Sequence, residues 1–392
     1  MCPTFLATGE EIMSTRGRAN AIRAALQLRG LGRIADPLRS EEMEAALSNC
    51  LSCKACTNEC PSNVNLALLK AELQWARIQR DGLSASERLF SSVDLLGRLG
   101  CLLPRIANGL LESQSVRRLL AAATGIEPER RLPPYARQRF DQSFARRKTK
   151  TAAPRGRVLL WDDTFVRYHD PHIGIAAVNV LELAGYEVAL VSGRRCCGRP
   201  AFSQGRLDEA AKLGSHNLAL LSRNGDALPI IFLEPSCFSM FIEDYHEMKL
   251  PEAERVAARC FLFEQFLDEL LRHDPEALVF QPRPTTVGIH VHCHAKALTY
   301  PAYMHRLAAR LPGRKVNYFD SGCCGMAGGF GMLAAKYELS QAIAAPLIEK
   351  IRELPYGSLV VASGASCRHQ IDHLASVRAR HMAEVLADAL ES

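Results

Sequence analysis

Two stretches near the amino terminus return to apolar side chains with the period of a helix. Residues 14–30 begin with a Ser-Thr pair and then place apolar residues every three or four positions, and residues 65–82 do the same after a Cys-Pro step. A polar cap followed by such a stripe predicts an amphipathic helix. We therefore expect residues 1–85 to form a small helical domain.

Residues 86–128 also have a helical pattern, and one side of it is strongly apolar. Such a stripe suits a membrane surface or a partner protein. The commoner explanation is a pair of helices packed against their own protein, which is what we expect here. The stripe consists of Leu89, Phe90, Leu95, Leu96, Leu99, Leu102 and Leu103.

Residues 129–157 form a basic segment punctuated by prolines. Ten Arg or Lys residues stand against two acids, Glu129 and Asp141, so the segment alone carries a net charge of +8 in a chain whose total is +6. A run of this kind suits a polyanion or a membrane surface, but a solvated linker is the commoner case. We expect residues 86–153 to be a helical connector that ends in a basic linker.

The remainder of the chain repeats itself. GRVLLWDD parallels TTVGIHVHC, GYEVALVSGRRCCGRPAF parallels GRKVNYFDSGCCGMAGGF, and LPIIFLEPSC parallels YGSLVVASGASC. Corresponding cysteines lie 127 residues apart (Cys196 and Cys323) and 130 residues apart (Cys237 and Cys367). Short β-branched runs alternate with helical stretches in each copy, which predicts a duplicated α/β unit with parallel strands. The predicted units are residues 154–280 and 281–392.

The cysteines of the repeats each come just after a strand-like run. The carboxyl ends of parallel strands meet at one edge of an open sheet, where such sheets bind their ligands. The thiols of one unit should therefore converge although they are far apart in the sequence. They are Cys196, Cys197 and Cys237 in the first unit, and Cys293, Cys323, Cys324 and Cys367 in the second.

Cysteine is the unusual residue of the composition, with 14 in 392 residues. The amino terminus is too polar for a signal peptide, and so many cysteines in a chain that is not exported favour metal sites over disulfides. No apolar run approaches the ~18 residues of a membrane span, and the net charge of +6 does not require nucleic acid as a partner. We expect a cytoplasmic protein, at most peripheral at the inner face of the membrane.

The stretch CLSCKACTNECP has the cysteine spacing of a ferredoxin, C-x2-C-x2-C-x3-C-P, at Cys50, Cys53, Cys56 and Cys60. Thiolates are soft, anionic ligands that suit iron–sulfur clusters, and the compact spacing followed by proline favours a 4Fe-4S cluster over zinc.

Cys2 precedes a proline, as the last cysteine of a ferredoxin motif does. In two-cluster ferredoxins the fourth cysteine of each motif binds the other cluster. Cys2 would then complete the cluster of Cys50, Cys53 and Cys56, and Cys60 would serve a second cluster whose other ligands lie upstream. The alternative is that the four cysteines from Cys50 to Cys60 hold one cluster alone. We favour the arrangement with Cys2.

The motifs CCGRP…EPSC and HCH…GCCGMAGGFG…SGASCRHQ resemble the cysteine-rich CCG domains. These domains occur in heterodisulfide reductase, in the iron–sulfur subunits of glycolate oxidase and anaerobic glycerol-3-phosphate dehydrogenase, and in the C-terminal part of FAD-linked D-lactate or D-2-hydroxyglutarate dehydrogenases. The resemblance covers nearly the whole chain. It implies an α+β multidomain protein in which a helical ferredoxin-like domain precedes two duplicated α/β units with parallel strands.

The chain departs from the CCG pattern in both units. The pattern has an early cysteine, the CCG pair and a closing C-x2-C, but Gly364 occupies the first closing position of the second unit. The first unit has only three cysteines, and its early position falls near Asp162, Asp163 or Thr164. Carboxylate oxygen is a harder ligand than thiolate. We therefore expect a cluster in the second unit, at Cys293, Cys323, Cys324 and Cys367, and none in the first.

Three histidines alternate around Cys293. On a strand, His290, His292 and His294 would share one face and Cys293 would take the other. Near a cluster a histidine can donate a hydrogen bond to sulfur, accept a proton or replace a ligand, although each one singly is more often a packed core residue.

The function that the resemblance implies is electron transfer. A separate FAD domain or subunit would oxidise a 2-hydroxy acid such as D-lactate, D-2-hydroxyglutarate or glycolate, and this chain would pass the electrons to a quinone or another carrier. We expect no oxidation of the substrate by the chain alone, because we find no flavin or nicotinamide motif in it. The alternatives are a component of a heterodisulfide or thiol reductase and a zinc-stapled interaction protein.

Overall fold

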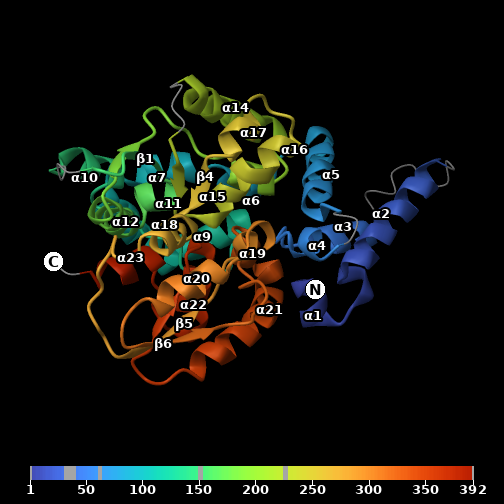
Figure 1. Cartoon of the computed structure of the whole chain (residues 1–392). Coiled ribbons are helices and arrows are strands. Elements are labelled where there is room, and N and C mark those ends of the chain that lie inside the picture. Colours follow the sequence, from blue (N-terminus) through green and yellow to red (C-terminus); the bar gives the residue numbers. More distant parts are fainter. Residues whose placement is uncertain (1, 31–40, 61–63, 149–152, 224–227, 391–392) are drawn as a thin grey trace.

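The computed structural model describes residues 2–30, 41–60, 64–148, 153–223 and 228–390. Its first part is helical, as the periodicity predicted, and these helices lie together on one side of the molecule (Figure 1). They are α1 (Pro3–Thr8), the 3-10 turn η1 (Glu11–Met13), α2 (Thr15–Gly30), α3 (Glu41–Ser48), α4 (Ala55–Glu59) and α5 (Leu66–Asp81).

Local signals explain where these helices begin and how they pack. The Asn65 side chain accepts a hydrogen bond from the backbone N–H of Leu68 at 3.0 Å and starts α5, as a helix N-cap does. Ala25, Met43 and Leu47 form a small apolar core between α2 and α3. The helical domain therefore has its own core, but a small one.

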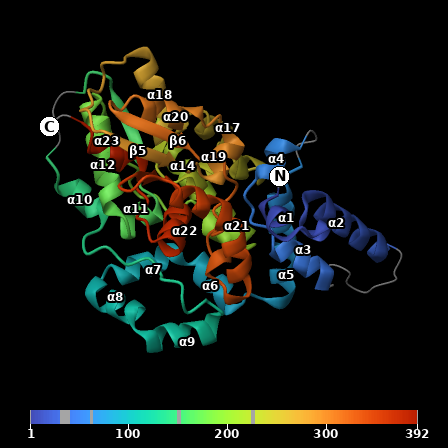
Figure 2. The ribbon, with the colours of Figure 1, turned by 90° about the horizontal axis from the view of Figure 1, so that it is seen from below.

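The helices of the connector expose much of their apolar stripe. They are α6 (Ala85–Ser91), α7 (Val93–Gly100), α8 (Pro104–Glu112) and α9 (Gln114–Thr124), and Figure 2 shows α7, α8 and α9 along one edge of the molecule. The expectation of a stripe packed on its own protein is wrong for four leucines, which are 52–69% exposed. The exposed residues are Leu95, Leu99, Leu102 and Leu103.

The basic segment is partly built into the fold. The expectation of a solvated linker is wrong at Arg130, whereas most of the other described basic side chains of the segment are exposed. The segment contains the helix α10 (Phe140–Arg146). Arg130 is buried and donates hydrogen bonds to Gln370 Oε1 at 2.7 Å and to Ser340 Oγ at 3.2 Å. This guanidinium ties the segment to the second repeat, and buried polar groups of this kind need such partners.

Two parallel sheets form the rest of the molecule, and both have the same strand order at their core. The first sheet has the order β2-β1-β3-β4 and the second the order β6-β5-β7, so β5, β6 and β7 repeat β1, β2 and β3. All pairings are parallel, with Leu159 opposite Ile230 in the first sheet and Val287 opposite Leu359 in the second. The predicted parallel strands are confirmed. The strands are β1 (Arg157–Trp161), β2 (Glu187–Leu190), β3 (Ile230–Phe232), β4 (Cys260–Leu262), β5 (Thr285–Ile289), β6 (Arg314–Tyr318) and β7 (Leu359–Val361).

Helices alternate with the strands in both repeats. Around the first sheet they are α11 (Thr164–Tyr168), α12 (Pro171–Leu183), α13 (Arg199–Ser203), α14 (Leu207–Arg223), α15 (Pro235–Ser239), the π-helical turn η3 (Met240–Asp244), α16 (Tyr245–Glu247), α17 (Ala253–Ala257) and α18 (Phe263–His273). Around the second they are α19 (Cys293–Leu298), α20 (Ala302–Ala309), the 3-10 turn η4 (Phe330–Met332), α21 (Ala334–Arg352), α22 (Ala365–Ala375) and α23 (Met382–Ala387).

The glycine after each cysteine pair has a structural reason. Gly198 and Gly325 both have a positive φ, +84° and +81°, a region that other residues rarely adopt. A Cβ at Gly325 would lie 2.3 Å from the carbonyl oxygen of Ser340 in α21. The glycine therefore lets the cysteine loop turn sharply against the helix.

The two repeats are joined by polar contacts as well as by a shared apolar core. Glu234 follows β3, and its carboxylate accepts a hydrogen bond from the backbone N–H of Ala365, at the start of α22, at 2.8 Å. The ring of His381 lies 3.0 Å from the carbonyl oxygen of Leu233. One buried cluster contains strand residues of both sheets. In the described part of the chain, no helix has the length and apolar character to cross a membrane.

Glu264 lies in this interface and should make the stability of the protein depend on pH. It is buried, and burial together with the nearby Glu234 raises the pKa of its carboxyl to about 7. An acid with a raised folded-state pKa contributes stability below its unfolded pKa and loses it as pH rises towards 7. The loss should amount to roughly 3 kcal/mol between about pH 4.5 and 7.

The variant that tests this is Glu264→Gln. The Ser363 hydroxyl donates to the Glu264 carboxylate, and the glutamine amide oxygen can accept the same hydrogen bond. The free energy of unfolding of this variant, relative to the native chain, should rise between pH 5 and pH 8, because only the native chain has to ionise the buried group. Chemical denaturation at both pH values measures this difference. Glu187→Gln, at a surface pair with Arg157, is the control. A difference that stays constant with pH would contradict the assignment.

Candidate iron–sulfur sites

Four cysteines of the helical domain line one cavity. Cys2 stands at the start of α1, Cys50 follows α3, Cys53 lies in the next loop and Cys56 is in α4. Their side chains share the cavity with Pro3, Thr4, Thr15, Arg18, Leu51, Ser52, Lys54, Ala55, Leu66 and Ala67. Four thiols around one cavity are a donor set that fits an iron–sulfur cluster.

Cys60 has a different position. It ends α4, where its backbone N–H donates to the carbonyl oxygen of Cys56 at 2.9 Å. Among the residues that the structure describes, those lining the cavity include Cys2 but not Cys60. This geometry supports the arrangement in which Cys2 completes the set.

A buried arginine faces Cys2. Arg18 is fully buried, and its guanidinium donates to Cys2 Sγ at 3.0 Å and to Thr4 Oγ1 at 3.1 Å. Burial raises the pKa of the Cys2 thiol, but the hydrogen bond with Thr4 and the charge of Arg18 outweigh it, so the pKa is lowered. A cation beside the thiol favours the thiolate, which is the form that binds metal.

Lys54 anchors the cysteine loop to the first repeat. Ser52 and Lys54, on either side of Cys53, both have positive φ, 51° and 62°, so the loop is strained here. The Lys54 side chain is fully buried, and its Nζ donates to Asp244 Oδ1 at 2.9 Å and to Glu243. The strained loop is therefore held by a buried ion pair to a residue 190 positions away.

The four cysteines of the second repeat converge at the carboxyl ends of its strands. Cys293 begins α19 just after β5, Cys323 and Cys324 follow β6, and Cys367 lies in α22 after β7. Their thiols form a row, from Cys293 to Cys323 to Cys324 to Cys367, in which each thiol affects the pKa of its neighbour. The interaction with the Cys323 thiol and burial raise the pKa of Cys293 well above its usual value. Buried thiols in such a row need a metal to become thiolates, and coordination by a metal deprotonates them outright.

The histidines around Cys293 do not lie on a strand, so the expected alternation is wrong. β5 ends at Ile289 and α19 begins at Cys293, so the strand periodicity stops before His290. All three imidazoles are buried nonetheless. His294 Nε2 lies 3.0 Å from the carbonyl oxygen of Ser52, which links this loop to the helical domain.

The first repeat holds three thiols and a carboxyl group. Cys197 Sγ lies 3.0 Å from Cys237 Sγ, and the Thr164 hydroxyl donates to Cys196 Sγ at 3.7 Å. Asp163 caps α11, and burial and the charge of Glu234 raise the pKa of its carboxyl to about 7. The carboxyl is therefore largely neutral at acidic pH and ionises only near pH 7. Three thiols and a carboxyl are a harder ligand set than the four thiols of the second repeat, and the absence of a cluster here stays a prediction.

Asp162, beside Asp163, pairs with two arginines instead of facing the thiols. Its carboxylate accepts from Arg167 at 2.6 Å and from Arg194 at 3.2 Å. Of the three positions considered for the missing cysteine, Asp163 and Thr164 face the thiols, whereas Asp162 closes an ion pair.

The cavity of the helical domain and the thiol row of the second repeat are neighbours. Leu51 and Cys323 belong to one apolar cluster, and Cys53 and Cys293 pack against it. Burial raises the pKa of Cys53 well above its usual value, and the nearby Cys293 thiol adds to this effect. The two groups of thiols, 240 positions apart in the sequence at Cys53 and Cys293, meet at one interface.

The sequence analysis did not predict the buried cations of these sites. Arg18, Lys54 and Arg199 are all buried, yet a charged residue in a polar stretch normally predicts a solvated surface. Arg199 donates to Ser239 and Asp244, the acid that also binds Lys54. The position of Arg199 directly after the Cys-Cys-Gly turn was the sequence feature that could have indicated its burial.

None of the 14 cysteines, all of which lie among the described residues, forms a disulfide.

Family models match three parts of the chain. Residues 1–64 match a 4Fe-4S dicluster domain, and residues 163–242 and 287–372 match the cysteine-rich domain, CCG. Both matches cover the cysteines described above. They confirm the resemblance that the motifs indicated and show that this is an iron–sulfur protein.

Three relatives illustrate how this architecture is used. The chain is 30% identical over 334 residues to a subunit of the anaerobic glycerol-3-phosphate dehydrogenase of Escherichia coli (strain K12), covering 84% of this chain and 83% of that protein. It is 27% identical to D-2-hydroxyglutarate dehydrogenase of Pseudomonas putida over 98% of its own length but only 41% of the relative's. It is 26% identical to lactate utilization protein A of Bacillus cereus, over 59% of this chain and 98% of that one. The chain therefore belongs to the CCG family of cysteine-rich iron–sulfur proteins.

Proposed function

We propose that this chain is the iron–sulfur electron-transfer component of a flavin-linked dehydrogenase. One 4Fe-4S cluster is held by Cys2, Cys50, Cys53 and Cys56, and a second is held by the four cysteines of the second repeat. A bound cluster supplies one-electron redox chemistry that no side chain offers. The observation that carries the proposal is the contact of Cys53 with the apolar cluster that contains Cys323 and touches Cys293.

The residues around the thiols supply the conditions that the two sites need. Arg18 brings positive charge to Cys2 in the first site. Lys296, beside the second, donates to the backbone carbonyl oxygen of Ser321. Burial lowers the pKa of Lys296, and the nearby thiols of Cys293, Cys367 and Cys323 oppose this effect in their charged form. Cations placed in this way favour a negatively charged thiolate cluster in a low-dielectric interior.

The substrate belongs to the partner. We propose a 2-hydroxy acid of the D-lactate, D-2-hydroxyglutarate or glycolate type, oxidised on an FAD-containing domain or subunit, with a quinone or another carrier as acceptor. Two of the relatives named above carry names that point to such acids. The exposed leucines of α7 and of the turn before α8 are suited to contact with a partner or a membrane surface. A heterodisulfide-reductase function is the weaker candidate, because the first repeat keeps only three of its cysteines.

We expect the purified chain to contain about two clusters' worth of iron and acid-labile sulfide. Cys50→Ser should remove the cluster of the helical domain, and Cys324→Ser should remove that of the second repeat, because each substitution deletes a thiolate ligand. Cys197→Ser should leave the iron content unchanged. Cys101→Ser, outside all of the thiol groups, is the control. Equal iron loss from Cys197→Ser and Cys324→Ser would overturn the assignment to one repeat.

A second experiment on the same purified chain tests its role as an electron carrier. Photoreduced free FAD should reduce the clusters, as seen by bleaching of their visible absorption, because a reduced flavin donates single electrons. D-lactate, D-2-hydroxyglutarate and glycolate added without a flavoprotein should not. Reduction of the clusters by one of these acids alone would contradict a pure electron-transfer role.

A further inference from the structure

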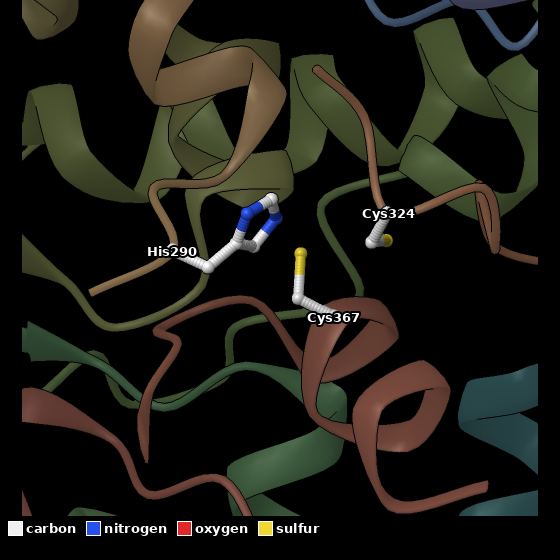
Figure 3. A group of neighbouring side chains, drawn as sticks. All are labelled: His290, Cys324 and Cys367. Carbon is white, nitrogen blue, oxygen red and sulfur yellow. The ribbon is translucent and has the colours of Figure 1, made fainter. Parts of the chain in front are cut away.

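His290 places a nitrogen atom among the cysteines of the second repeat. Its ring and the sulfur atoms of Cys324 and Cys367 offer ligand atoms that all lie within 4.8 Å of one another, and all three residues are buried. Figure 3 shows the imidazole directed at the sulfur of Cys367, with Cys324 on the far side. The ring comes from the residue after β5, the two sulfurs from the loop after β6 and from α22. Three strand ends thus contribute to one point.

Within the described part of the chain, one ring nitrogen of His290 has a hydrogen-bond partner and the other has none. Nδ1 lies 3.0 Å from the hydroxyl of Ser321. Nε2 is buried and makes no hydrogen bond among the described residues. A buried polar atom without a partner costs free energy, so such an atom in a thiol site calls for an explanation. A bond between Nδ1–H and a neighbouring oxygen is the usual way in which proteins orient a histidine that binds metal through Nε2.

We propose that His290 is a nitrogen ligand of the iron–sulfur centre of the second repeat, binding iron through Nε2 beside the thiolates of Cys324 and Cys367. The proposal rests on the cluster assigned to this repeat under the proposed function and adds a fifth protein ligand to its four cysteines. Ser321, through its hydroxyl, holds the ring in position.

Position 364 cannot supply this ligand. A Cβ at Gly364 would lie 2.3 Å from Cδ2 of His292, closer than real Cβ contacts come, so the buried His292 ring occupies the space of any side chain there. The Nδ1 atom of His292 already accepts from the backbone N–H of His294 at 3.1 Å. His292 therefore fills space and caps α19, while His290 keeps a nitrogen for the centre.

A neutral imidazole, where the CCG pattern has a fifth and anionic thiolate, leaves the centre with less negative charge. Iron–sulfur centres with histidine ligands have higher reduction potentials than comparable centres with cysteine alone. The centre of the second repeat would then be a better electron acceptor than the same centre with a fifth thiolate.

The test measures nitrogen coordination directly. The full chain carrying Cys50→Ser is produced with 15N-labelled histidine, so that only the second centre remains, and is reduced with dithionite for pulsed EPR. A histidine bound to iron gives a strong nitrogen hyperfine coupling, whereas one that only donates a hydrogen bond to sulfur gives a weak one. We expect the strong coupling, and we expect it to disappear in His290→Ala. In the matched control His292→Gln, altered at a second buried imidazole of the same loop, it should persist.

A second variant separates ligation from folding. His290→Cys keeps a ligand at the same position, so iron content should be retained while the nitrogen coupling is lost and the reduction potential falls. A strong coupling that survives His290→Ala, or only a weak coupling in the unsubstituted chain, would overturn the role of His290 alone. Absence of any cluster in the Cys50→Ser chain would instead overturn the cluster assigned to the second repeat, and with it this inference.

Discussion

Cys2→Ser is expected to damage the cluster of the helical domain, and Cys60→Ser is expected to leave it intact. Cys2 lines the cavity with Cys50, Cys53 and Cys56. Cys60 follows α4 and is not among the described residues that line this cavity. Loss of the Cys2 thiolate leaves one iron without a protein ligand. The cluster should then lose about one iron of its four and convert to a three-iron form.

The same substitution also replaces the thiolate beside a buried cation by a neutral hydroxyl. The guanidinium of Arg18 donates to Cys2 Sγ at 3.0 Å, and the side chain is fully buried. A serine hydroxyl can still accept from the guanidinium but carries no negative charge, and leaving a buried cation without its anionic partner costs about 3 kcal/mol or more. The melting temperature of Cys2→Ser should therefore fall, while that of Cys60→Ser should change little.

Iron and sulfide analysis, with the EPR spectrum of the oxidised protein, measures the first effect. A three-iron cluster gives a signal in the oxidised state, and it should appear in Cys2→Ser alone. To avoid overlap with the other centre, both variants are made in a Cys324→Ser background. If Cys60→Ser gives the three-iron signal and Cys2→Ser keeps its cluster, the four cysteines from Cys50 to Cys60 form a closed site and the assignment of Cys2 is wrong.

Lys54→Met is expected to cause a large loss of stability at the contact between the helical domain and the first repeat. The ammonium group is fully buried between Asp244 and Glu243. Removal leaves two carboxylates together, with Arg199 as the remaining cation next to Asp244. Breaking a buried ion pair by removing one partner typically costs about 3–5 kcal/mol.

Two readouts follow the effect of Lys54→Met. Thermal unfolding should show a clear fall in melting temperature, and limited proteolysis should cut more rapidly around residues 50–60, because the cysteine loop loses its anchor. Arg16→Met is the control, since its pair with Glu11 at 2.9 Å is exposed and such pairs contribute about 0–1 kcal/mol. Equal effects from both substitutions would show that the contact between the domain and the repeat does not depend on Lys54.

The parts of the fold that are encoded locally could be predicted from the sequence. The caps and periodicity around α2 and α5 are properties of short segments, and the matched strand orders follow from the repeated motifs. The convergence of Cys293, Cys323, Cys324 and Cys367 followed from one rule about parallel strands. In each case a short pattern, or two copies of it, contains the information.

The features that could not be predicted depend on contacts between distant segments. Lys54 meets Asp244 across 190 positions, and Arg130 meets Gln370 across 240. Neither charge differs in sequence from one on a solvated surface. The position of the His290 ring could not be predicted for another reason. Strand β5 ends one residue before His290, so strand periodicity does not predict the direction of its ring.

The closeness of Cys53 to Cys293 and Cys323 has a consequence for how the two sites accept charge. Two unit charges about 10 Å apart in a medium of effective dielectric about 20 repel by roughly 1.7 kcal/mol. With clusters at both sites, charge on one therefore makes the other harder to reduce, and the pair titrates with shared macroscopic potentials instead of as two independent carriers. Such anticooperativity favours the state with a single electron. The two electrons released when an alcohol is oxidised would then cross this protein one after the other, without accumulating in it.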